Sequence, residues 1–265
     1  SLGAMYTGCF GRAMGADGVF VVADTARTAA YRAEPTIFNG EPIAATYLTY
    51  DEAAAQAAET PFDVVLYAVK YGALAEAMEQ SAPLVGADTA IISVLNGVTS
   101  EEVLAERFGW DRVLLCVAQQ MDSRKVGPVV TAGCVGVLAL GVRDGASAAQ
   151  RANLARVTAW LSAIDQPFIC PKDIRHQLWG KLICNVGVNQ ACAVYDCCFD
   201  GIHAPGEARE AMIGAMGEVA AVGRAEGVDL TDADVAYWLD IIDHLNPAGM
   251  PSLRQDVLAR RPTEV

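Results

Sequence analysis

Three polar side chains with regular spacing interrupt an apolar stretch late in the sequence. Lys181, Asn185 and Asn189 are four residues apart, and most residues between them are apolar, so a helix here carries one polar stripe. A buried amine and two buried amides cost several kcal/mol unless they find partners. A polar network between packed helices or a ligand site would supply such partners, and the spacing alone favours neither.

The residue types of the stripe suit proton transfer to a polar substrate. The pKa of a lysine responds readily to burial, so a lysine in a cleft can donate a proton near neutral pH. Asparagine amides can orient a hydroxyl or a carboxylate without adding charge. If the stripe is a ligand site, we expect an acid and two binding groups on one helix face.

Two continuous apolar runs, 64–69 and 90–95, have the pattern of buried parallel strands. The first ends at Lys70 and the second at Asn96, at the carboxyl ends where open α/β sheets hold ligands. Taken singly, Lys70 is an ordinary solvated strand end, and Asn96 with the following glycine is an ordinary tight turn.

The first residues resemble the second half of a strand–helix–strand unit. A helix that includes Gly3 leads to a short apolar strand at 19–24, which ends in Asp24. Dinucleotide-binding folds hold a ribose hydroxyl on an acid at this position, and Gly3 would be the last glycine of their Gly-x-Gly-x-x-Gly turn. The first strand and two glycines would then precede Ser1, so we expect the sequence to be a fragment.

Strand patterns stop at Pro171. Four segments with helical patterns follow it, at 173–197, 206–226, 231–243 and 251–260. We therefore predict an α/β, Rossmann-like dinucleotide-binding domain over 1–170, without its first strand. We predict that an all-α substrate and dimerisation domain follows over 171–265, without its C-terminal part. The apolar helices of this domain could pair in a homodimer.

The composition excludes several classes of protein. Hydrophobic residues make up 53% and charged residues 19%, which is typical of a globular protein. With 19 basic and 32 acidic residues the net charge is −13, which argues against nucleic acid or anionic membrane as a partner. No apolar run reaches the roughly 18 residues of a membrane span, and no signal peptide is visible. The eight cysteines form no Cys-x-x-Cys pair, so we expect reduced thiols, no metal site and a cytoplasmic location.

The order of motifs along the whole chain resembles the ketopantoate reductase (2-dehydropantoate 2-reductase) family, within the 6-phosphogluconate-dehydrogenase-like enzymes. Five stretches carry the resemblance: Ala68-Val69-Lys70, Leu95-Asn96-Gly97-Val98, Trp179-Gly180-Lys181-Leu182 with Asn185 and Asn189, Pro251-Ser252-Leu253-Arg254-Gln255-Asp256, and Arg261-Pro262-Thr263-Glu264. The helix with Lys181 and the segment 252–264 are the most specific of them.

The resemblance implies reduction of 2-dehydropantoate to pantoate by NAD(P)H, in pantothenate and coenzyme A biosynthesis. Lys181 would then protonate the ketone oxygen as hydride arrives from the nicotinamide. Asn185, Asn189 and Ser252 would hold the carboxylate and hydroxyl groups of this small 2-oxo acid, and Glu264 would accept a hydrogen bond from a substrate hydroxyl.

The resemblance also implies a cofactor site. Gly3 would lie under the pyrophosphate, Lys70 near the cofactor and Asn96 beside the nicotinamide. The family mostly uses NADPH, which favours NADP here. Asp24, however, would repel a 2′-phosphate and suits a free ribose hydroxyl, whereas Arg27 could reach a phosphate, so NAD stays open.

Two departures from the family pattern leave alternatives. Gln190 stands where the family often has proline, and Leu253 where it usually has methionine. A paralogue that reduces another branched 2-oxo acid would account for both. A non-catalytic dinucleotide-binding or regulatory protein is a third alternative, which the joint presence of the five catalytic and substrate-binding candidates disfavours.

Overall fold

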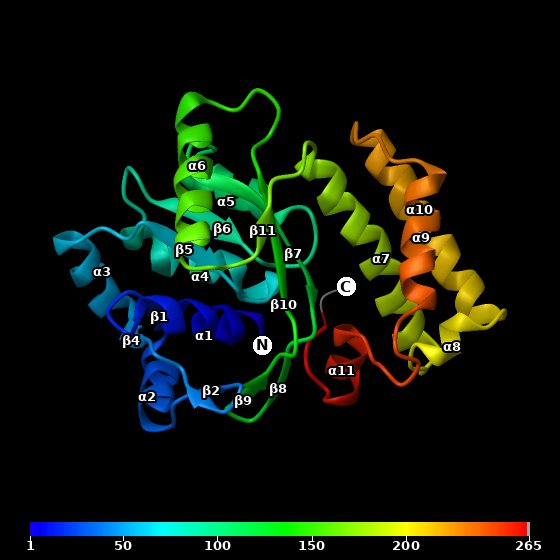
Figure 1. The fold of residues 1–265 in the computed structure, drawn as a ribbon, viewed down its shortest axis with the longest axis horizontal. Helices are drawn as coiled ribbons and strands as arrows, with labels where there is room; N and C mark the ends of the chain where they lie inside the picture. The colour runs from blue at the N-terminus through cyan, green and yellow to red at the C-terminus, as the bar shows by residue number, and fades with distance from the viewer. Residues whose placement is uncertain (264–265) are drawn as a thin grey trace. The chain divides into compact units, whose positions relative to one another are not determined.

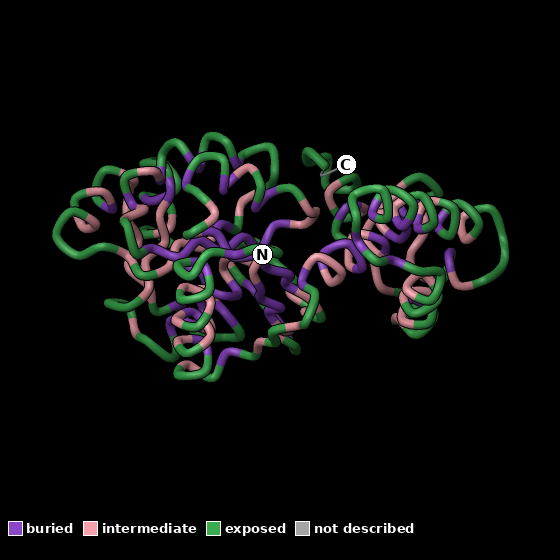
Figure 2. Tube along the Cα trace, turned by 90° about the horizontal axis from the view of Figure 1, so that it is seen from above, coloured by how far each residue is buried: buried purple, intermediate pink, exposed green. Residues whose placement is uncertain are grey.

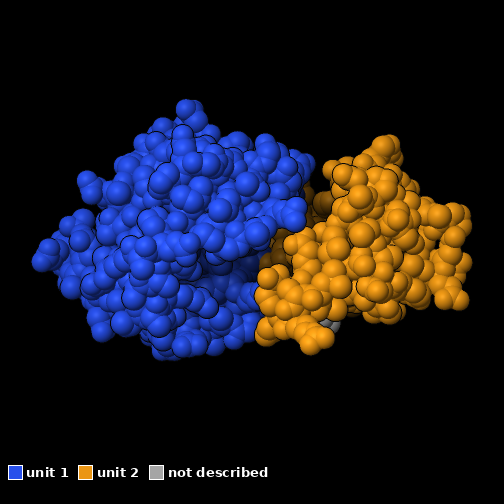
Figure 3. All heavy atoms as spheres, turned by 90° about the horizontal axis from the view of Figure 1, so that it is seen from below, with its two compact units in different colours: residues 1–95, 99–174 blue, residues 96–98, 175–265 orange. Residues whose placement is uncertain are grey.

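The computed structural model describes residues 1–263, and the chain divides into two compact units (Figure 1, Figure 3). Unit 1 comprises Ser1–Leu95 and Thr99–Ile174. Unit 2 comprises Asn96–Val98 together with the residues from Arg175 on. Three residues from the middle of the chain therefore belong to the C-terminal unit.

Unit 1 is built on a sheet with parallel strands. Its five-stranded sheet has the order β11-β10-β7-β6-β5, in which β5, β6 and β7 are parallel, β10 is antiparallel to β7, and β11 is parallel to β10. These strands are β5 (Val64–Tyr67), β6 (Ala90–Ser93), β7 (Val113–Met121), β10 (Val135–Gly141) and β11 (Phe168–Ile169).

Two smaller sheets complete the strands of unit 1. β1 (Phe20–Ala23) and β4 (Thr46–Thr49) form a separate parallel pair. A four-stranded sheet has the order β3-β2-β9-β8. Its strands are β2 (Ile37–Phe38), β3 (Glu41–Pro42), β8 (Arg124–Val126) and β9 (Val129–Thr131).

Helices cover both faces of the five-stranded sheet. They are α1 (Leu2–Met14), α4 (Leu74–Ser81), α5 (Ser100–Phe108) and α6 (Ala148–Ala163), with short 3₁₀ turns at Tyr71–Ala73 and Ala82–Leu84. α2 (Thr25–Ala33) and α3 (Tyr50–Glu59) pack against the separate β1–β4 pair. Neighbouring residues of β6 point to opposite faces: Ile92 packs in a core with Tyr6 of α1 and Val157 of α6, and Ile91 in a core with α4 and α5. A strand buried on both faces needs an apolar run, which Ala90, Ile91 and Ile92 of β6 provide.

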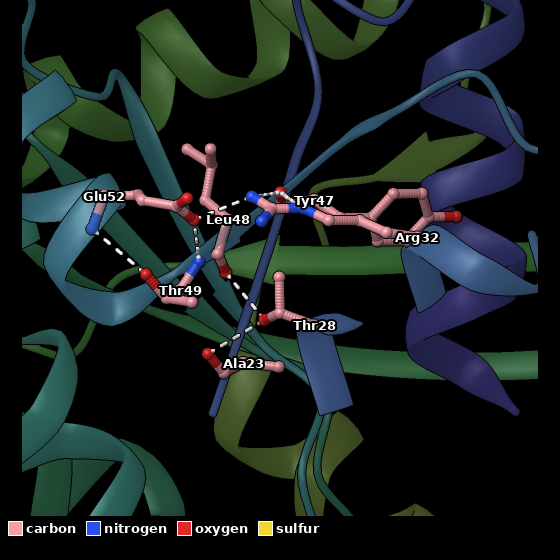
Figure 4. Close-up of polar contacts among 7 residues, drawn as sticks. All are labelled: Ala23, Thr28, Arg32, Tyr47, Leu48, Thr49 and Glu52. Carbon is pink, nitrogen blue, oxygen red and sulfur yellow. Dashed lines mark hydrogen bonds and ion pairs between the residues drawn. The ribbon is translucent and has the colours of Figure 1, made fainter. Parts of the chain in front are cut away.

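Side-chain caps determine where α2 and α3 begin, and Figure 4 shows the cap of α3. The Asp24 carboxylate accepts from the Arg27 amide at 2.8 Å, and this fixes the start of α2. Thr49 and Glu52 form a reciprocal capping box at the start of α3. The Thr28 hydroxyl lies 3.2 Å from the carbonyl oxygens of both Ala23 and Leu48, so α2 is tied to β1 and to β4.

The regular secondary structure in the described part of unit 2 is all helical. Its helices are α7 (Ile174–Val194), α8 (Asp200–His203), α9 (Glu207–Ala225), α10 (Asp232–Asp243) and α11 (Ser252–Leu258). At Gly187 α7 approaches α9 so closely that a Cβ would lie 2.5 Å from Met216 Cγ and 3.1 Å from the Met212 carbonyl oxygen. Val98 packs against this helical core, and in Figure 2 the buried parts of the trace gather inside each unit.

The predicted fold class, an α/β Rossmann-like domain followed by a helical one, is confirmed. All eight cysteines are free thiols, as expected. Within residues 1–263, none of the helices combines the length and the apolar character that a membrane span requires.

Candidate functional site

The polar stripe of α7 meets an asparagine from the middle of the chain. Lys181 Nζ donates to Asn96 Oδ1 at 3.1 Å, and Asn185 Nδ2 lies 3.5 Å from the same oxygen. Lys181 and Asn185 are therefore on one face of α7, as their spacing predicts. All three side chains are half-buried and belong to unit 2.

The chain brings Asn96 to this place by a short path from the sheet. β6 ends at Ser93, and its hydroxyl lies 3.3 Å from the Leu95 amide. Gly97 has a φ of 100°, a left-handed conformation that glycine adopts at little cost. Val98 then anchors the segment in the helical core. Asn96 thus stands just beyond the carboxyl end of a central parallel strand, where open α/β sheets hold ligands.

The arrangement joins a cation to neutral amides. Because Asn96 Oδ1 faces Lys181 and Asn185, the Asn96 Nδ2 group is oriented as a donor. Burial raises the pKa of the neighbouring Cys184 thiol to about 11, and the positive charge of Lys181 opposes that rise. A primary ammonium held by amides can donate a proton and stabilise negative charge that develops on a nearby oxygen.

The other predicted substrate residues are less closely joined to this group. Asn189 lies one turn beyond Asn185 and is half-buried, and its side chain makes no hydrogen bond to another described residue. Ser252 begins α11 and is exposed, with no hydrogen bond to Asn96, Lys181 or Asn185 in the part of the chain that the structure describes. Glu264 lies outside the described residues.

The predicted cofactor residues of unit 1 lie near the ends of β1 and β5. Gly3 is in the first turn of α1, and a Cβ there would lie 3.0 Å from the Ala68 Cβ, just after β5. The close helix–strand contact that the last glycine of a dinucleotide-binding turn permits is therefore present. Asp24 is exposed at the end of β1, and its Oδ2 lies 3.9 Å from Arg27 Nε. Lys70 is exposed and precedes the 3₁₀ turn after β5.

One buried titratable group of unit 1 has no counterpart among the predicted residues. Glu101, in the first turn of α5, is only 2% exposed. Its Oε2 accepts from the Ser100 hydroxyl at 2.8 Å and its Oε1 from the Cys116 amide at 3.3 Å. Burial outweighs these bonds and raises the pKa of Glu101 to about 7. An acid in the first turn of a helix is usually solvated, so the sequence has no feature that predicts this burial.

Two family models match most of the chain. The model described as ketopantoate reductase PanE/ApbA matches residues 1–144. The model described as ketopantoate reductase PanE/ApbA C terminal matches residues 173–265. Together they cover both units and both groups of candidate residues.

A curated relative and two solved structures are similar to the chain. The 2-dehydropantoate 2-reductase of Streptococcus pyogenes serotype M3 is 23% identical over 204 residues, which are 77% of this chain and 66%, just under two thirds, of that protein. A 2-dehydropantoate 2-reductase structure from Geobacter metallireducens GS-15 has a TM-score of 0.83 at 23% identity, covering 100% of this chain and 86% of that one.

The second structure is a ternary complex of D-mandelate dehydrogenase with NADH and anilino(oxo)acetate. Its TM-score is 0.82 at 18% identity, covering 99% of this chain and 84% of that one. At these identities the two structures establish the fold alone. The family models extend over far more than half of the sequence, and on that ground the chain belongs to the ketopantoate reductase PanE/ApbA family.

Proposed function

We propose that the protein reduces a 2-oxo acid to the corresponding 2-hydroxy acid with a nicotinamide dinucleotide, and that the substrate is 2-dehydropantoate, which becomes pantoate. The observation that carries the proposal is the hydrogen bond from Lys181 Nζ to Asn96 Oδ1 at 3.1 Å. It joins a proton donor on the helical unit to the residue that follows a central strand of the sheet.

In this proposal Lys181 supplies the proton of the reduction. Addition of a hydride to a ketone carbon breaks the carbonyl π bond and leaves the electron pair on the oxygen. The ammonium of Lys181 would stabilise that negative charge and transfer one proton to it, which completes the hydroxyl group. A positioned general acid contributes roughly 10²–10⁴-fold in rate.

The neutral amides would orient the substrate beside the lysine. The carboxylate of a 2-oxo acid accepts hydrogen bonds, and Asn185 and Asn189 each offer an amide donor on the same helix face. Asn189 is the member of the stripe for which no described residue supplies a bond. We assign Ser252 and Glu264 to hydroxyl groups of the substrate, as the family resemblance implies.

The residues of unit 1 suit a dinucleotide in their chemistry. Gly3 has no side chain and lies close to Ala68. Backbone amides of the first turn of α1 can therefore face a pyrophosphate. Asp24 and Arg27 are exposed at the end of β1, and Lys70 is exposed after β5. When bound, the nicotinamide supplies the hydride. We favour NADP from the family, with NAD as the alternative that the Asp24 carboxylate supports.

The main alternative keeps the reaction and changes the acid. Gln190 and Leu253, the two departures from the family pattern, lie on α7 and α11, the helices that carry Lys181 and Ser252. A different side chain at either position would alter the space beside the substrate. A protein that binds a dinucleotide without catalysis is the second alternative.

Oxidation of NADPH and of NADH, each with 2-dehydropantoate and with other branched 2-oxo acids, tests the proposal in the full-length gene product. We expect turnover with 2-dehydropantoate, and Lys181→Ala should lower kcat by roughly 10²–10⁴-fold while cofactor affinity stays unchanged. Lys172→Ala, which removes an exposed lysine nearby in sequence, is the control and should change neither quantity.

Three results would contradict parts of this proposal. An unchanged kcat in the Lys181→Ala variant would remove Lys181 from the chemistry. Turnover with another 2-oxo acid alone would replace the substrate. Cofactor binding without turnover on any 2-oxo acid would leave only the dinucleotide-binding alternative.

A further inference from the structure

A chain of buried polar side chains joins the two ends of the loop that carries Asn96. Ser93 is the last residue of β6 and Ser100 the first of α5, and their hydroxyl oxygens lie 2.8 Å apart. Ser100 in turn donates to Glu101 Oε2 at 2.8 Å. These three residues, which we call the clasp, are at most 2% exposed, so water does not compete for their bonds. The clasp therefore closes the base of the loop 94–99.

Each hydroxyl of the clasp donates toward the carboxylate. Because the Ser100 proton goes to Glu101, the hydrogen between the two serine oxygens must belong to Ser93. The lone pairs of Ser93 Oγ are then open to other donors, and the Leu95 amide lies 3.3 Å from this oxygen. The amide next to Asn96 is thus connected to a buried carboxylate through two hydroxyl groups.

The carboxylate of the clasp is itself held where the ladder between β6 and β7 ends. Ile92 and Leu114 are the last paired residues of these strands. Two residues further along β7, the Cys116 amide donates to Glu101 Oε1 at 3.3 Å. The sheet therefore fixes one oxygen of the carboxylate, and the other oxygen fixes Ser100.

Stability alone does not account for a carboxyl group at this position. Burial raises the pKa of Glu101 to about 7, so part of the protein carries a buried charge at neutral pH. Buried ionic groups can often be replaced by apolar side chains of similar volume without a loss of stability. A satisfied polar network adds a unique arrangement of the groups that it joins. Here the joined groups are the two ends of the loop 94–99.

We propose that Glu101 is a positioning residue, which holds Asn96 in place for Lys181 through the clasp. Gly97 follows Asn96 with a φ of 100°, and glycine restricts the backbone less than any other residue. A fixed base of the loop is therefore needed to limit where the Asn96 side chain can stand. That side chain accepts from Lys181 Nζ at 3.1 Å. For its effect on turnover the inference rests on the proposed function, whereas the clasp is independent of it.

Hydrogen exchange in the full-length gene product tests the clasp without a measurement of activity. Ser93→Ala and Glu101→Ala each remove one member, so the amides of residues 94–99 should exchange roughly tenfold faster in either variant. Glu101→Gln should exchange like the original protein, because its side chain can still bond to both of its neighbours.

Ser81→Ala is the matched control for these variants. It removes another buried hydroxyl of unit 1, which lies 2.6 Å from the Tyr67 hydroxyl oxygen and has no bond to the clasp. The cost in stability should be similar, because both substitutions remove a buried hydroxyl that is hydrogen-bonded. The exchange of residues 94–99 should stay unchanged in this control.

Turnover of the same variants tests the positioning role. Ser93→Ala and Glu101→Ala should each lower kcat by roughly tenfold, since a small misplacement of a group in the site can cost up to 10²-fold in rate. The KM for the 2-oxo acid should change little. In an Asn96→Ala background the same substitutions should have no further effect, because the group that they position is absent. Ser81→Ala should leave kcat unchanged in both backgrounds.

Different results would overturn the two parts of the inference. Equal exchange of residues 94–99 in the original protein and in both alanine variants of the clasp would mean that the clasp does not hold the loop. Faster exchange with an unchanged kcat, or an equal loss of kcat in the Asn96→Ala background, would mean that the clasp positions nothing for the reaction. Absence of turnover with any 2-oxo acid would instead refute the proposed function, and the exchange result would then decide the clasp by itself.

Discussion

Replacing Glu101 by glutamine should remove a pH-dependent loss of stability from unit 1. The carboxyl group is 2% exposed, and burial raises its pKa from 4.5 to about 7 despite the bonds from Ser100 and Cys116. Glutamine keeps the shape and can keep the bonds. Its oxygen can accept from the Cys116 amide, and its amino group can donate to Ser100 Oγ, because either member of the Ser93–Ser100 pair can be the donor.

The sign of the effect follows from the direction of the pKa change. The pKa of Glu101 is higher in the folded than in the unfolded chain, so the folded protein keeps a proton that the unfolded chain releases. The resulting stabilisation is fully present below pH 4.5 and is lost as the pH rises through about 7. The two pKa values differ by about 2.5 pKa units, and each pKa unit corresponds to about 1.4 kcal/mol. The stabilisation of the folded protein therefore amounts to about 3 kcal/mol.

Urea unfolding across this pH range measures the effect as a difference between variants. The free energy of unfolding of Glu101→Gln, relative to the original protein, should rise by about 3 kcal/mol between the acid and the alkaline end. Glu102→Gln, at the adjacent exposed position, is the control and should show no such rise. Parallel pH profiles of the free energy of unfolding for Glu101→Gln and the original protein would refute the reasoning. They would mean that Glu101 has the same pKa in the folded and the unfolded chain.

Two further substitutions test the end of β1 and the packing of α7 on α9. Asp24→Asn keeps an oxygen to cap α2 but removes the charge near Arg27, so the preference for NADPH over NADH should rise by roughly fivefold, about 1 kcal/mol of repulsion at a solvated site. An unchanged ratio of kcat/KM values for the two nucleotides would mean that Asp24 does not face the ribose. Gly187→Ala would place a Cβ 2.5 Å from Met216 Cγ and should cost about 1–3 kcal/mol in urea unfolding. Gly217→Ala, on α9 with open space around it, should be neutral or stabilising, and equal effects of the two would contradict the packing argument.

Local sequence patterns predict the elements whose stabilising interactions are themselves local. The pattern at 206–226 predicts α9 within one residue at each end, Glu207–Ala225. The pattern at 231–243 predicts α10 within one residue, where Thr231 and Asp234 form a capping box. Apolar runs likewise predict β5 and β6, because a strand covered by helices on both faces has few polar positions, and Ser93 at the end of β6 is the polar one.

Elements that depend on distant partners are not predictable in this way. No pattern in residues 25–60 predicts a helix or a strand, yet two helices and three strands lie there. Ile37 of β2 pairs with Val129 of β9, so a two-residue strand is defined by a partner far along the chain. α2 carries little apolar surface, and its main start signal, the Asp24 cap, is the acid that the family resemblance assigns to the ribose.

The same limit applies to the site. The spacing of Lys181 and Asn185 predicts a shared helix face, but their partner Asn96 stands 85 and 89 residues earlier in the chain. Spacing within one helix contains no information about such a partner. The strand pattern places Asn96 at a strand end that can hold a ligand, and the resemblance to the reductase family makes it a cofactor contact, but neither predicts its bond to Lys181.

The bonds of Asn96 bear on the two explanations of the polar stripe. A purely structural network would require a protein partner for every buried polar group of the stripe. Asn96 meets that requirement for Lys181 and Asn185. Asn189 is half-buried on the same helix, one turn further along, and its amide is not among the fully buried groups that lack a partner in the described chain, so solvent can satisfy it. A network inside the protein thus accounts for Lys181 and Asn185, and a substrate at Asn189 belongs to the proposed function, which the turnover of the Lys181→Ala variant tests.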